Sequence, residues 1–459
     1  MEQFDKIKQY TKTVCEQIRW KKAHTNISEE IESHIIDQKE AYLLSGMDEV
    51  TATDNAIKQM GDPVVVGTQL DRTHRPKAQW TMLSLTVVLV LIGYIINTYM
   101  IHEPGFPTQK RVFLSVFIGL GVMLIAYFLD FSIIAKYPRL VYAAIILFAI
   151  VIFLASPRYI GGAAFYTVYA SLLFPLAFAA IIYWARGKGY LGIILCGISV
   201  LLPALITISI PSAASFLLLV FSGLILLSIA IYKNWFAVNK LFGYLLVYIP
   251  TLIAFALMLI NLLYRLGIRL RVAFDPSIDP LGYGWQGSVA KALLDNSKLI
   301  GTGTMPTQYK DLQGFFPLPG IDTDFSLTYL IFKFGWIAFI VIMAIIVLFI
   351  AKGFILSLKQ KSTLGLLVSL SVVLTFTLQA VGYVLTNLGF ILFAPISLPL
   401  VSYGNTATII NMALIGLMLS VFRTGSVVND SAPIKASNSD FITWDEGKLI
   451  INFGKKSRN

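Results

Sequence analysis

Charged side chains are scarce in this chain of 459 residues, because Asp, Glu, Lys and Arg together make up only 13% of it. A soluble domain usually carries about 25%. The shortage is uneven: residues 1–78 hold many of the charges, whereas residues 81–423 consist mostly of long apolar stretches. This division predicts a membrane domain with a soluble N-terminal appendage.

Cysteine and histidine are also rare, which argues against further classes of site. Cys15 and Cys196 lie far apart and the four histidines show no ligand spacing, so we predict neither a disulfide framework nor a metal site. The net charge of +11 does not indicate nucleic acid, because Lys and Arg lie largely in short loops between apolar runs. Since the first 78 residues are polar, we expect no cleavable signal peptide.

The first 78 residues predict a small cytoplasmic helical prefix domain with a regulatory or docking role. A helix from about Glu2 to His24 comes first, and Asn26 with Glu29 resembles a capping box that would start the second. Asp48 can cap a third helix, and a short fourth covers residues 64–72. Three isoleucines recur at helical spacing on the second helix: Ile27, Ile31 and Ile35.

Ten apolar runs follow, and most reach the roughly 20 residues that a membrane-spanning helix needs. They cover residues 80–100, 112–129, 140–155, 164–184, 190–206, 213–232, 241–264, 324–351, 364–390 and 405–422. Each run must be helical, because lipid offers no partners for free backbone groups. We therefore predict an all-α, polytopic membrane domain over residues 79–424.

The short loops give the orientation of these helices. With the N-terminus inside, the inner loops carry most of the cations, namely Lys136, Arg139, Arg186, Lys188, Lys233, Lys240, Lys352, Lys359 and Lys361. The matching short outer loops carry only Lys110, Arg111 and Arg158. The positive-inside rule then places both termini in the cytoplasm, together with a loosely structured polar tail at residues 425–459.

Two outward segments depart from this pattern. Residues 265–323, between the seventh and eighth runs, form a loop too rich in aromatic and apolar residues to be disordered. Residues 393–403, which include Pro395 and Pro399, predict a bent and partly re-entrant stretch. Such backbone is tolerated at membrane depth only beside protein or a polar cavity.

Asp324 stands out chemically, because it lies where the long loop meets the eighth apolar run. A carboxylate entering a membrane helix is costly unless it faces protein or water, and such a site suits a general base. The structural alternative is a helix N-terminus, with Thr323 or Asp322 as the cap and Asp324 favouring the dipole. The residues alone leave both interpretations open.

Four cations at the two ends of the long loop also need partners. Lys333 lies about two and a half turns into the same predicted helix, where it either snorkels to the interface or faces a polar cavity. Arg265, Arg269 and Arg271 cluster at the outer end of the seventh helix, against the positive-inside bias. They can bind a phosphate or pyrophosphate, or equally a lipid headgroup.

Several motifs in the last third of the chain occur in a characteristic order. Residues 269–276 read Arg-Leu-Arg-Val-Ala-Phe-Asp-Pro, and 279–288 read Asp-Pro-Leu-Gly-Tyr-Gly-Trp-Gln-Gly-Ser. A glycine-rich stretch at 301–303 leads to Thr307-Gln308, then Leu-Pro at 318–319 precedes Thr323-Asp-Phe. Residues 398–404 read Leu-Pro-Leu-Val-Ser-Tyr-Gly and include Ser402 and Tyr403. Over roughly residues 80–423 the chain resembles the SEDS family (shape, elongation, division and sporulation), which includes FtsW, RodA and SpoVE.

The resemblance implies a peptidoglycan glycosyltransferase of the bacterial cytoplasmic membrane that polymerises lipid II at the outer face. Asp324 matches the essential aspartate of the family and would be the catalytic base. Substrate contacts would come from the three arginines, from Lys333 and from the motif residues Thr307, Gln308, Thr323, Ser402 and Tyr403. The resemblance also implies a transpeptidase partner of the class B penicillin-binding type and allows for a divalent cation, Mg²⁺ or Mn²⁺, at the leaving group.

The chain also departs from the family pattern. Gly320 replaces the signature glutamate, while Phe332 and Lys333 stand where two acidic residues are common. Polar residues of the early helices are largely lost, for example at Tyr169-Ala-Ser-Leu. We therefore interpret the chain as a divergent member, and two other functions stay open: a flippase for a lipid-linked precursor, and a non-catalytic scaffold for a cell-wall synthase.

Overall fold

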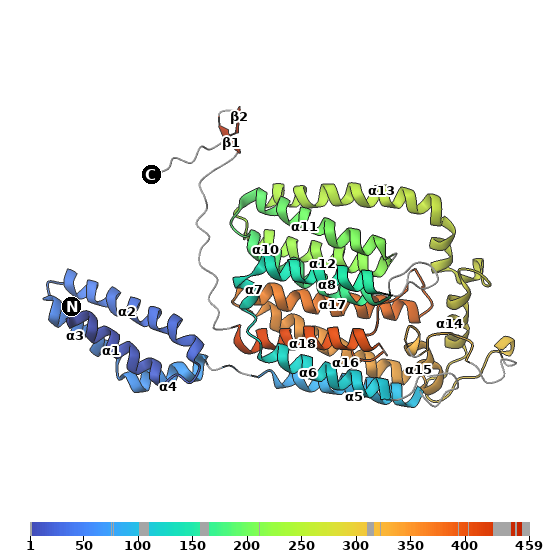
Figure 1. The fold of residues 1–459 in the computed structure, drawn as a ribbon, viewed down its shortest axis with the longest axis horizontal. Helices are drawn as coiled ribbons and strands as arrows, with labels where there is room; N and C mark the ends of the chain where they lie inside the picture. Colours follow the sequence, from blue (N-terminus) through green and yellow to red (C-terminus); the bar gives the residue numbers. More distant parts are fainter. Residues whose placement is uncertain are drawn as a thin grey trace. The chain divides into compact units, whose positions relative to one another are not determined.

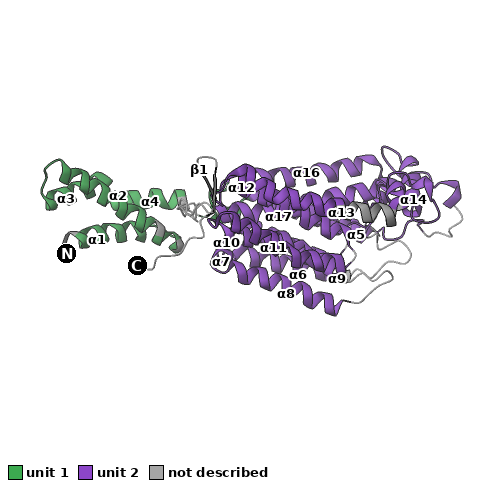
Figure 2. Ribbon diagram, turned by 90° about the horizontal axis from the view of Figure 1, so that it is seen from above, with its two compact units in different colours: residues 1–79, 360–362, 422–431 green, residues 80–359, 363–421, 432–459 purple. Residues whose placement is uncertain are grey.

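The computed structural model describes residues 2–74, 76, 78–100, 110–156, 165–210, 212–309, 316–321, 323–392, 394–402, 404–425, 442–445 and 448–451. Most of these residues are helical, as Figure 1 shows. The chain divides into two compact units, coloured separately in Figure 2. Unit 1 comprises residues 1–79, 360–362 and 422–431, and unit 2 comprises residues 80–359, 363–421 and 432–459.

Unit 1 contains four helices around its own hydrophobic core. They are α1 (Glu2–Glu16), α2 (His24–Leu44), α3 (Glu49–Met60) and α4 (Pro63–His74), with a 3₁₀ turn η1 (Lys21–Ala23) between the first two. The isoleucines of α2 are buried in that core together with residues of α1 and α3, which confirms the predicted apolar face. The core members are Ile7, Tyr10, Val14, Ile18, Ala23, Ile27, Ile31, Ile35 and Ala56.

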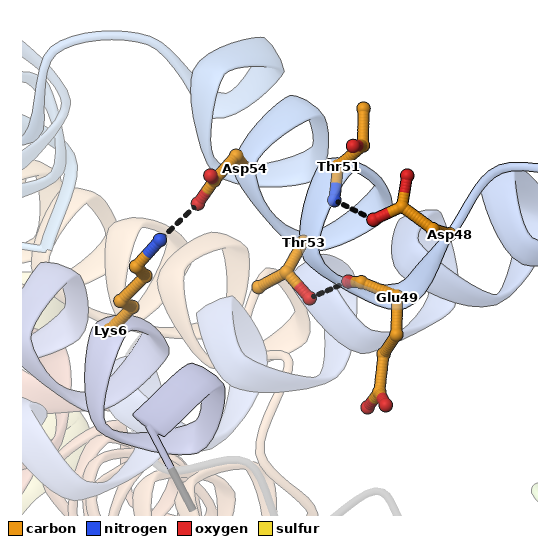
Figure 3. Close-up of polar contacts among 6 residues, drawn as sticks. All are labelled: Lys6, Asp48, Glu49, Thr51, Thr53 and Asp54. Carbon is orange, nitrogen blue, oxygen red and sulfur yellow. Dashed lines mark hydrogen bonds and ion pairs between the residues drawn. The ribbon is translucent and has the colours of Figure 1, made fainter.

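The predicted start of the second helix is wrong, although the start of the third is confirmed. Helix α1 ends at Glu16, and extended backbone at Trp20 separates it from η1, so that α2 is already formed at Asn26. Asn26 therefore lies inside α2 and is not its N-cap residue, whereas the Asp48 carboxylate accepts the Thr51 N–H at 3.1 Å (Figure 3). An ion pair of 2.7 Å between Lys6 and Asp54 ties α1 to α3 in the same view.

Unit 2 is a helical bundle with the dimensions of a multi-pass membrane protein. Eight helical spans among the described residues are long and apolar enough to cross a membrane. Seven are α5 (Trp80–Met100), α8 (Pro138–Ala155), α11 (Gly189–Ser209), α12 (Ala213–Tyr232), α16 (Trp336–Leu358), α17 (Thr363–Asn387) and α18 (Asn405–Thr424). The eighth joins α9 (Phe165–Ala170), a 3₁₀ turn η2 (Ser171–Leu173) and α10 (Phe174–Ala185).

Two further apolar helices match the second and seventh predicted runs. They are α6 (Lys110–Phe128) and α13 (Lys240–Phe274), whose apolar stretches in the described residues are Leu114–Phe128 and Lys240–Ala256. The short helix α7 (Ile133–Lys136) connects α6 to α8. At the centre of the bundle, α17 packs against α10, α12 and α16, and both α17 and the α9–α10 span are largely buried.

The long loop begins later than predicted. Helix α13 runs for 35 residues to Phe274, which is roughly 52 Å and well beyond about 30 Å of hydrocarbon. The loop that was expected to start at Arg265 therefore starts at Asp275. It contains the 3₁₀ turns η3 (Pro276–Ile278) and η4 (Thr307–Tyr309) and the helix α14 (Trp285–Asp295), so the described part is folded.

The eighth predicted run is also broken, into α15 (Ser326–Phe334) and α16. Gly335 separates them with φ +93°, and a Cβ there would come within 2.5 Å of the Leu299 carbonyl oxygen. In the tail, two four-residue strands, β1 (Ile442–Asp445) and β2 (Lys448–Ile451), pair antiparallel with Ile442 opposite Ile451, so this part of the tail is ordered.

Candidate functional site

Asp324 follows a tight turn that begins at Gly320. The Gly320 carbonyl accepts hydrogen bonds from the N–H groups of Thr323 at 3.1 Å and Phe325 at 2.9 Å. Gly320 has φ +68°, a left-handed conformation that costs most side chains free energy. The glutamate of the family signature would be strained on this backbone, so the turn itself accounts for glycine at this position.

Side chains of α17 accept the N–H groups at the start of α15, where the alternative interpretation expected a cap from Thr323 or Asp322. Phe325, the N-cap residue of α15, makes no side-chain cap, and the Thr323 hydroxyl points back to the Gly320 carbonyl at 3.4 Å. The Ser326 N–H donates instead to the Tyr383 hydroxyl at 3.2 Å, and the Thr328 N–H donates to Asn387 Oδ1 at 2.9 Å. Thr323 therefore does not cap α15, and Asp322 lies outside the described residues.

The same two side chains fix the backbone at Asp324. The Tyr383 hydroxyl donates to the Thr323 carbonyl at 2.5 Å, and Asn387 Nδ2 donates to the Asp324 carbonyl at 2.8 Å. Tyr383 and Asn387 are both fully buried, whereas the Asp324 side chain is only partly buried. The carboxylate is thus carried on a turn fixed by buried side chains, while its own side chain is only partly enclosed.

Tyr383 and Asn387 belong to a polar stripe on α17 that also includes Gln379. Gln379 Oε1 accepts hydrogen bonds from Ser397 Oγ at 3.2 Å and from Asn411 Nδ2 at 3.4 Å. The three stripe residues are spaced four apart and so share one face of the helix. This spacing is visible within the ninth apolar run, where buried polar side chains mark functional positions, although these three residues were not among the predicted site residues.

Tyr169 connects Asp324 to the motif that contains Ser402. The buried Tyr169 hydroxyl on α9 lies within electrostatic range of the Asp324 carboxylate, as does the Tyr383 hydroxyl. A Cβ on Gly404 would lie 3.9 Å from the Tyr169 hydroxyl oxygen. Helices α9 and α17, the Asp324 turn and the start of α18 therefore converge on one place. In the sequence, Tyr169 showed only as a departure from the family pattern.

The re-entrant stretch packs against protein, as predicted. Asn97 Nδ2 on α5 donates to the Val401 carbonyl at 3.2 Å, and a Cβ on Gly93 would lie 2.2 Å from the Leu400 carbonyl oxygen. Ser402 is buried, and its hydroxyl accepts the Leu398 N–H at 2.9 Å. Ser402 thus holds the bend of this segment, while Tyr403 lies outside the described residues.

The other predicted site residues belong to α13, α15 and η4. Lys333 was expected about two and a half turns into a membrane-spanning helix. It lies instead in the last turn of the short helix α15, which ends before the spanning helix α16 begins. Thr307 and Gln308 are exposed on η4, and Arg271 is exposed near the end of α13. Arg265 and Arg269 are helical residues of α13 whose side chains lie outside the described part.

The glycine-rich stretch of the long loop binds the end of α15 through backbone hydrogen bonds. The Gly301 N–H donates to the Phe334 carbonyl at 3.0 Å, and the Gly303 N–H donates to the Phe332 carbonyl at 2.7 Å. Phe332, which stands where the family commonly has an acidic residue, is buried and packs edge-on against Phe316. This position therefore belongs to the core beneath the loop.

The described residues do not form a protein-held metal site. Within the part of the chain that the structure covers, no three His, Cys, Asp or Glu side chains gather in a way that could hold a metal ion. Asp324 is accompanied by tyrosine, asparagine and threonine, which are poor ligands for a divalent cation without further carboxylates. A divalent cation at this place would therefore need oxygen ligands from beyond these described side chains, such as those of a bound substrate.

Comparisons with solved structures agree with this architecture. A chain in the structure described as "Structural coordination of polymerization and crosslinking by a peptidoglycan synthase complex" aligns over 75% of this chain and 98% of its own length, with TM-score 0.57 and 20% identity. A variant of Rod shape determining protein RodA from Thermus thermophilus aligns over 76% and 98%, with TM-score 0.50 and 17% identity. At these identities the likeness establishes the fold.

Sequence comparisons identify the family. "Probable peptidoglycan glycosyltransferase FtsW" of Trichlorobacter lovleyi is 27% identical over 34% of this chain and 40% of its own length. "Peptidoglycan glycosyltransferase MrdB" of Escherichia coli K12 is 27% identical over 36% and 43%. The matched segment thus spans about two fifths of these relatives. Residues 74–426 match the family described as cell cycle proteins, FtsW/RodA/SpoVE. The chain belongs to the FtsW/RodA/SpoVE family and is a multi-pass protein of the cytoplasmic membrane.

Proposed function

We propose that this protein is a peptidoglycan glycosyltransferase that polymerises lipid II at the outer face of the membrane, with Asp324 as its general base. The observation that carries the proposal is the partly buried Asp324 carboxylate on a turn fixed by buried Tyr383 and Asn387. A general base must be held within hydrogen-bond reach of its proton. Membership of the FtsW/RodA/SpoVE family supports glycosyl transfer as the reaction in which this carboxylate acts.

The reaction follows from these groups. The Asp324 carboxylate takes the proton of the 4-hydroxyl of the acceptor sugar, and the oxygen forms a bond to the anomeric carbon of the donor. The bond from that carbon to the pyrophosphate oxygen breaks, its electron pair leaves with undecaprenyl pyrophosphate, and the anomeric configuration inverts. The rigid turn contributes orientation, because it fixes the base before the substrates arrive.

The leaving pyrophosphate needs cationic partners, and α13 offers arginines for this role. Arg265, Arg269 and Arg271 recur over two turns near the outer end of that helix, and Arg271 is exposed. We propose that they bind the pyrophosphate, with Lys333, Thr307, Gln308, Thr323, Ser402 and Tyr403 as further substrate contacts. A divalent cation, Mg²⁺ or Mn²⁺, would be bound mainly by the pyrophosphate oxygens, since the described residues provide no carboxylate cluster.

The proposed partner is a transpeptidase of the class B penicillin-binding type. The structural neighbour with TM-score 0.57 comes from a complex described as coordinating polymerization and crosslinking. A polymerase of this fold would pass its glycan product to such a crosslinking enzyme.

A polymerisation assay with labelled lipid II tests the base. Asp324→Asn keeps the size of the side chain and removes the proton acceptor, so we expect the rate to fall by about 10²-fold or more. Asp295→Asn is the matched control, because Asp295 is an exposed carboxylate on the same loop, and its rate should stay unchanged. Thermal unfolding of both variants verifies the fold.

Two other outcomes would replace the proposal. If the wild-type protein forms no polymer but moves labelled lipid II across vesicle membranes, it is a flippase, and alternating access becomes the mechanism to examine. If it does neither, while still binding a penicillin-binding protein, it is a scaffold. A polymer rate in Asp324→Asn equal to that of the wild type would remove Asp324 from the chemistry.

A further inference from the structure

A cluster of cations and aromatic rings lies at one end of the bundle, where α8 and α11 begin. Arg139 lies in the first turn of α8, and Lys188 is the N-cap residue of α11. Both approach the indole ring of Trp184 at the end of α10, with Lys188 Nζ 3.1 Å and Arg139 Cζ 5.3 Å from the ring centroid. Two cations from different helices therefore share one aromatic ring.

Two further cations close in the sequence also lie over aromatic rings. Arg186 Cζ lies 3.7 Å from the centroid of Tyr183, and Lys136 Nζ lies 5.2 Å from that of Tyr137. The turn between α10 and α11 is fixed by a hydrogen bond of 2.9 Å from the Gly187 N–H to the Trp235 carbonyl. The cationic cluster, defined as Lys136, Arg139, Arg186 and Lys188, is thus built on an anchored turn.

Like charges held this close require compensation. Burial first, and the Arg139 charge second, lower the pKa of the Lys188 ammonium below its ordinary value. The positive ends of the α8 and α11 dipoles also disfavour cations here. Among the ion pairs of the described residues, no carboxylate lies within 4.0 Å of Lys136, Arg139 or Lys188. The protein supplies ring faces, which only partly offset this repulsion.

The surface beside the cationic cluster is apolar and exposed. Tyr137 and Leu140 continue from the cluster along α8, and Tyr190 and Leu191 continue along α11. Helices α8 and α11 contact one another, so the four side chains belong to adjoining helices. A ligand with a negative head and an apolar body matches both parts of this surface.

We propose that the cationic cluster binds the headgroup of an anionic phospholipid, with the acyl chains lying on the exposed apolar faces of α8 and α11. The headgroup phosphate would lie between Arg139 and Lys188 and neutralise the repulsion between them. Basic sites between transmembrane helices on the cytoplasmic side recognise anionic lipids in this way, and the predicted orientation places the cluster on that side. The lipid site is independent of the reaction at Asp324.

Native mass spectrometry of the full-length protein in detergent tests the lipid site. The probes are phosphatidylglycerol and phosphatidylcholine of identical acyl chains, titrated separately. The wild type should retain one phosphatidylglycerol more tightly than phosphatidylcholine. The double variant Arg139→Gln, Lys188→Gln should weaken that phosphatidylglycerol by roughly 30-fold, from about 1 kcal/mol for each cation near an anionic surface, and leave phosphatidylcholine unchanged.

The matched control is Lys233→Gln, Lys359→Gln. It removes the same charge from two exposed lysines in other loops assigned to the same membrane side, and neither makes a ring contact in the described residues. Equal weakening in the control, or equal binding of the two lipids by the wild type, overturns the proposal. Complete displacement of the lipid by inorganic phosphate would also overturn it, in favour of a free-phosphate site. If the double variant fails to fold, Lys188→Gln alone should weaken phosphatidylglycerol several-fold.

Discussion

At the scale of single residues, the position of Asp324 depends on hydrogen bonds that other side chains make to its backbone neighbours. Tyr383 uses its one proton to bind the Thr323 carbonyl and accepts the Ser326 N–H in return. Asn387 binds the Asp324 carbonyl with its amide nitrogen and the Thr328 N–H with its oxygen. Because these four partners are backbone groups, the two side chains position the carboxylate through the backbone that carries it.

Tyr383→Phe should misplace Asp324 and destabilise the protein. The change leaves the Thr323 carbonyl and the Ser326 N–H without their partner in a buried place, which costs about 1–3 kcal/mol. We expect a lower melting temperature in detergent and a fall in kcat for polymerisation larger than the change in KM.

The variant Tyr142→Phe distinguishes a loss of stability from a misplaced Asp324. The Tyr142 hydroxyl donates to the Ser199 carbonyl at 2.6 Å between α8 and α11, away from Asp324. Its loss should lower stability by a similar amount and leave kcat nearly unchanged. If both variants reduce kcat equally, the Tyr383 hydroxyl serves stability alone.

The sequence was informative about Asp324 and much less so about its supports. Asp324 stands in a motif whose residues are consecutive, so it could be assigned from the sequence. Tyr383 and Asn387 were accessible in principle, as polar residues four apart in an apolar run, but their partners lie about sixty positions earlier. Tyr169 could not be assigned, because its approach to Asp324 depends on how α9 packs.

At the scale of elements, the re-entrant segment depends on the absence of a side chain at Gly93. The backbone of residues 394–402 lies directly against α5 there, and Asn97, one turn later, donates to the same segment. A helix packs this closely against backbone only where its own residue is small. The Gly93 contact therefore sets how closely the segment packs against α5.

Gly93→Ala should push the re-entrant segment away from α5. A Cβ would meet the Leu400 carbonyl oxygen at 2.2 Å and the Val401 Cα at 3.0 Å, and both are backbone atoms. We expect a loss of about 1–3 kcal/mol, typical of overpacking, measured as a lower melting temperature in detergent. Gly121→Ala is the control, because nothing lies within 4 Å of its Cβ position on α6. A melting temperature for Gly93→Ala equal to that of the control would refute the packing argument.

The helix boundaries show where sequence patterns lose information. The apolar run at residues 324–351 extends across Gly335, yet Gly335 ends α15, because Leu299 and Ile300 of the distant loop occupy the space beside it. At α13 the apolar run ends near Tyr264, but the helix continues to Phe274. The apolar content of a segment indicates whether it is surrounded by lipid, protein or water. The ends of its helix depend on capping and on tertiary contacts, which apolar content does not reveal.

In unit 1, the stability of α3 should depend on pH through its cap. Hydrogen bonds from the Thr51 side chain and backbone lower the pKa of the Asp48 carboxyl below its ordinary value. A carboxyl with a depressed folded-state pKa contributes stability above its unfolded pKa of about 3.9, and that stability is lost as pH falls through the folded pKa. The amide protection of α3 should therefore decrease as pH falls from about 5 to about 3.

Hydrogen exchange of the full-length protein, corrected for the intrinsic pH dependence, measures this effect. Asp48→Asn keeps an oxygen that can cap α3 but has no carboxyl to titrate, so the decrease in α3 protection should be smaller. Glu49 keeps a residual slope in both proteins, because hydrogen bonding and charge from Lys39 lower its pKa as well. An identical pH profile for Asp48→Asn would show that the cap is not the titrating group.

At the scale of the whole molecule, each hydrophobic core cluster of the described residues draws on one unit. The core cluster of the prefix domain and the side chains packed on it draw only on residues 7–70. Two further clusters of the described residues, which are built from α8–α13, α16 and α17 with their connecting turns, draw on residues 142–374. Burial of apolar surface is the main favourable term in folding. Residues 7–70 and residues 142–374 therefore each bury enough apolar surface within their own clusters to favour folding.

Removal of residues 1–78 should therefore leave the membrane domain folded. The cores built around α10 and α17, the polar stripe and the Asp324 turn all lie in residues 79–459, so the truncated protein should purify as a monodisperse species with an unchanged melting temperature in detergent. Lipid II polymerisation, if the proposed function holds, should persist, and any change would then report regulation by the prefix domain. Aggregation of the truncated protein would instead mean that the prefix domain contributes to the stability of the membrane domain, contrary to what the separate cores imply.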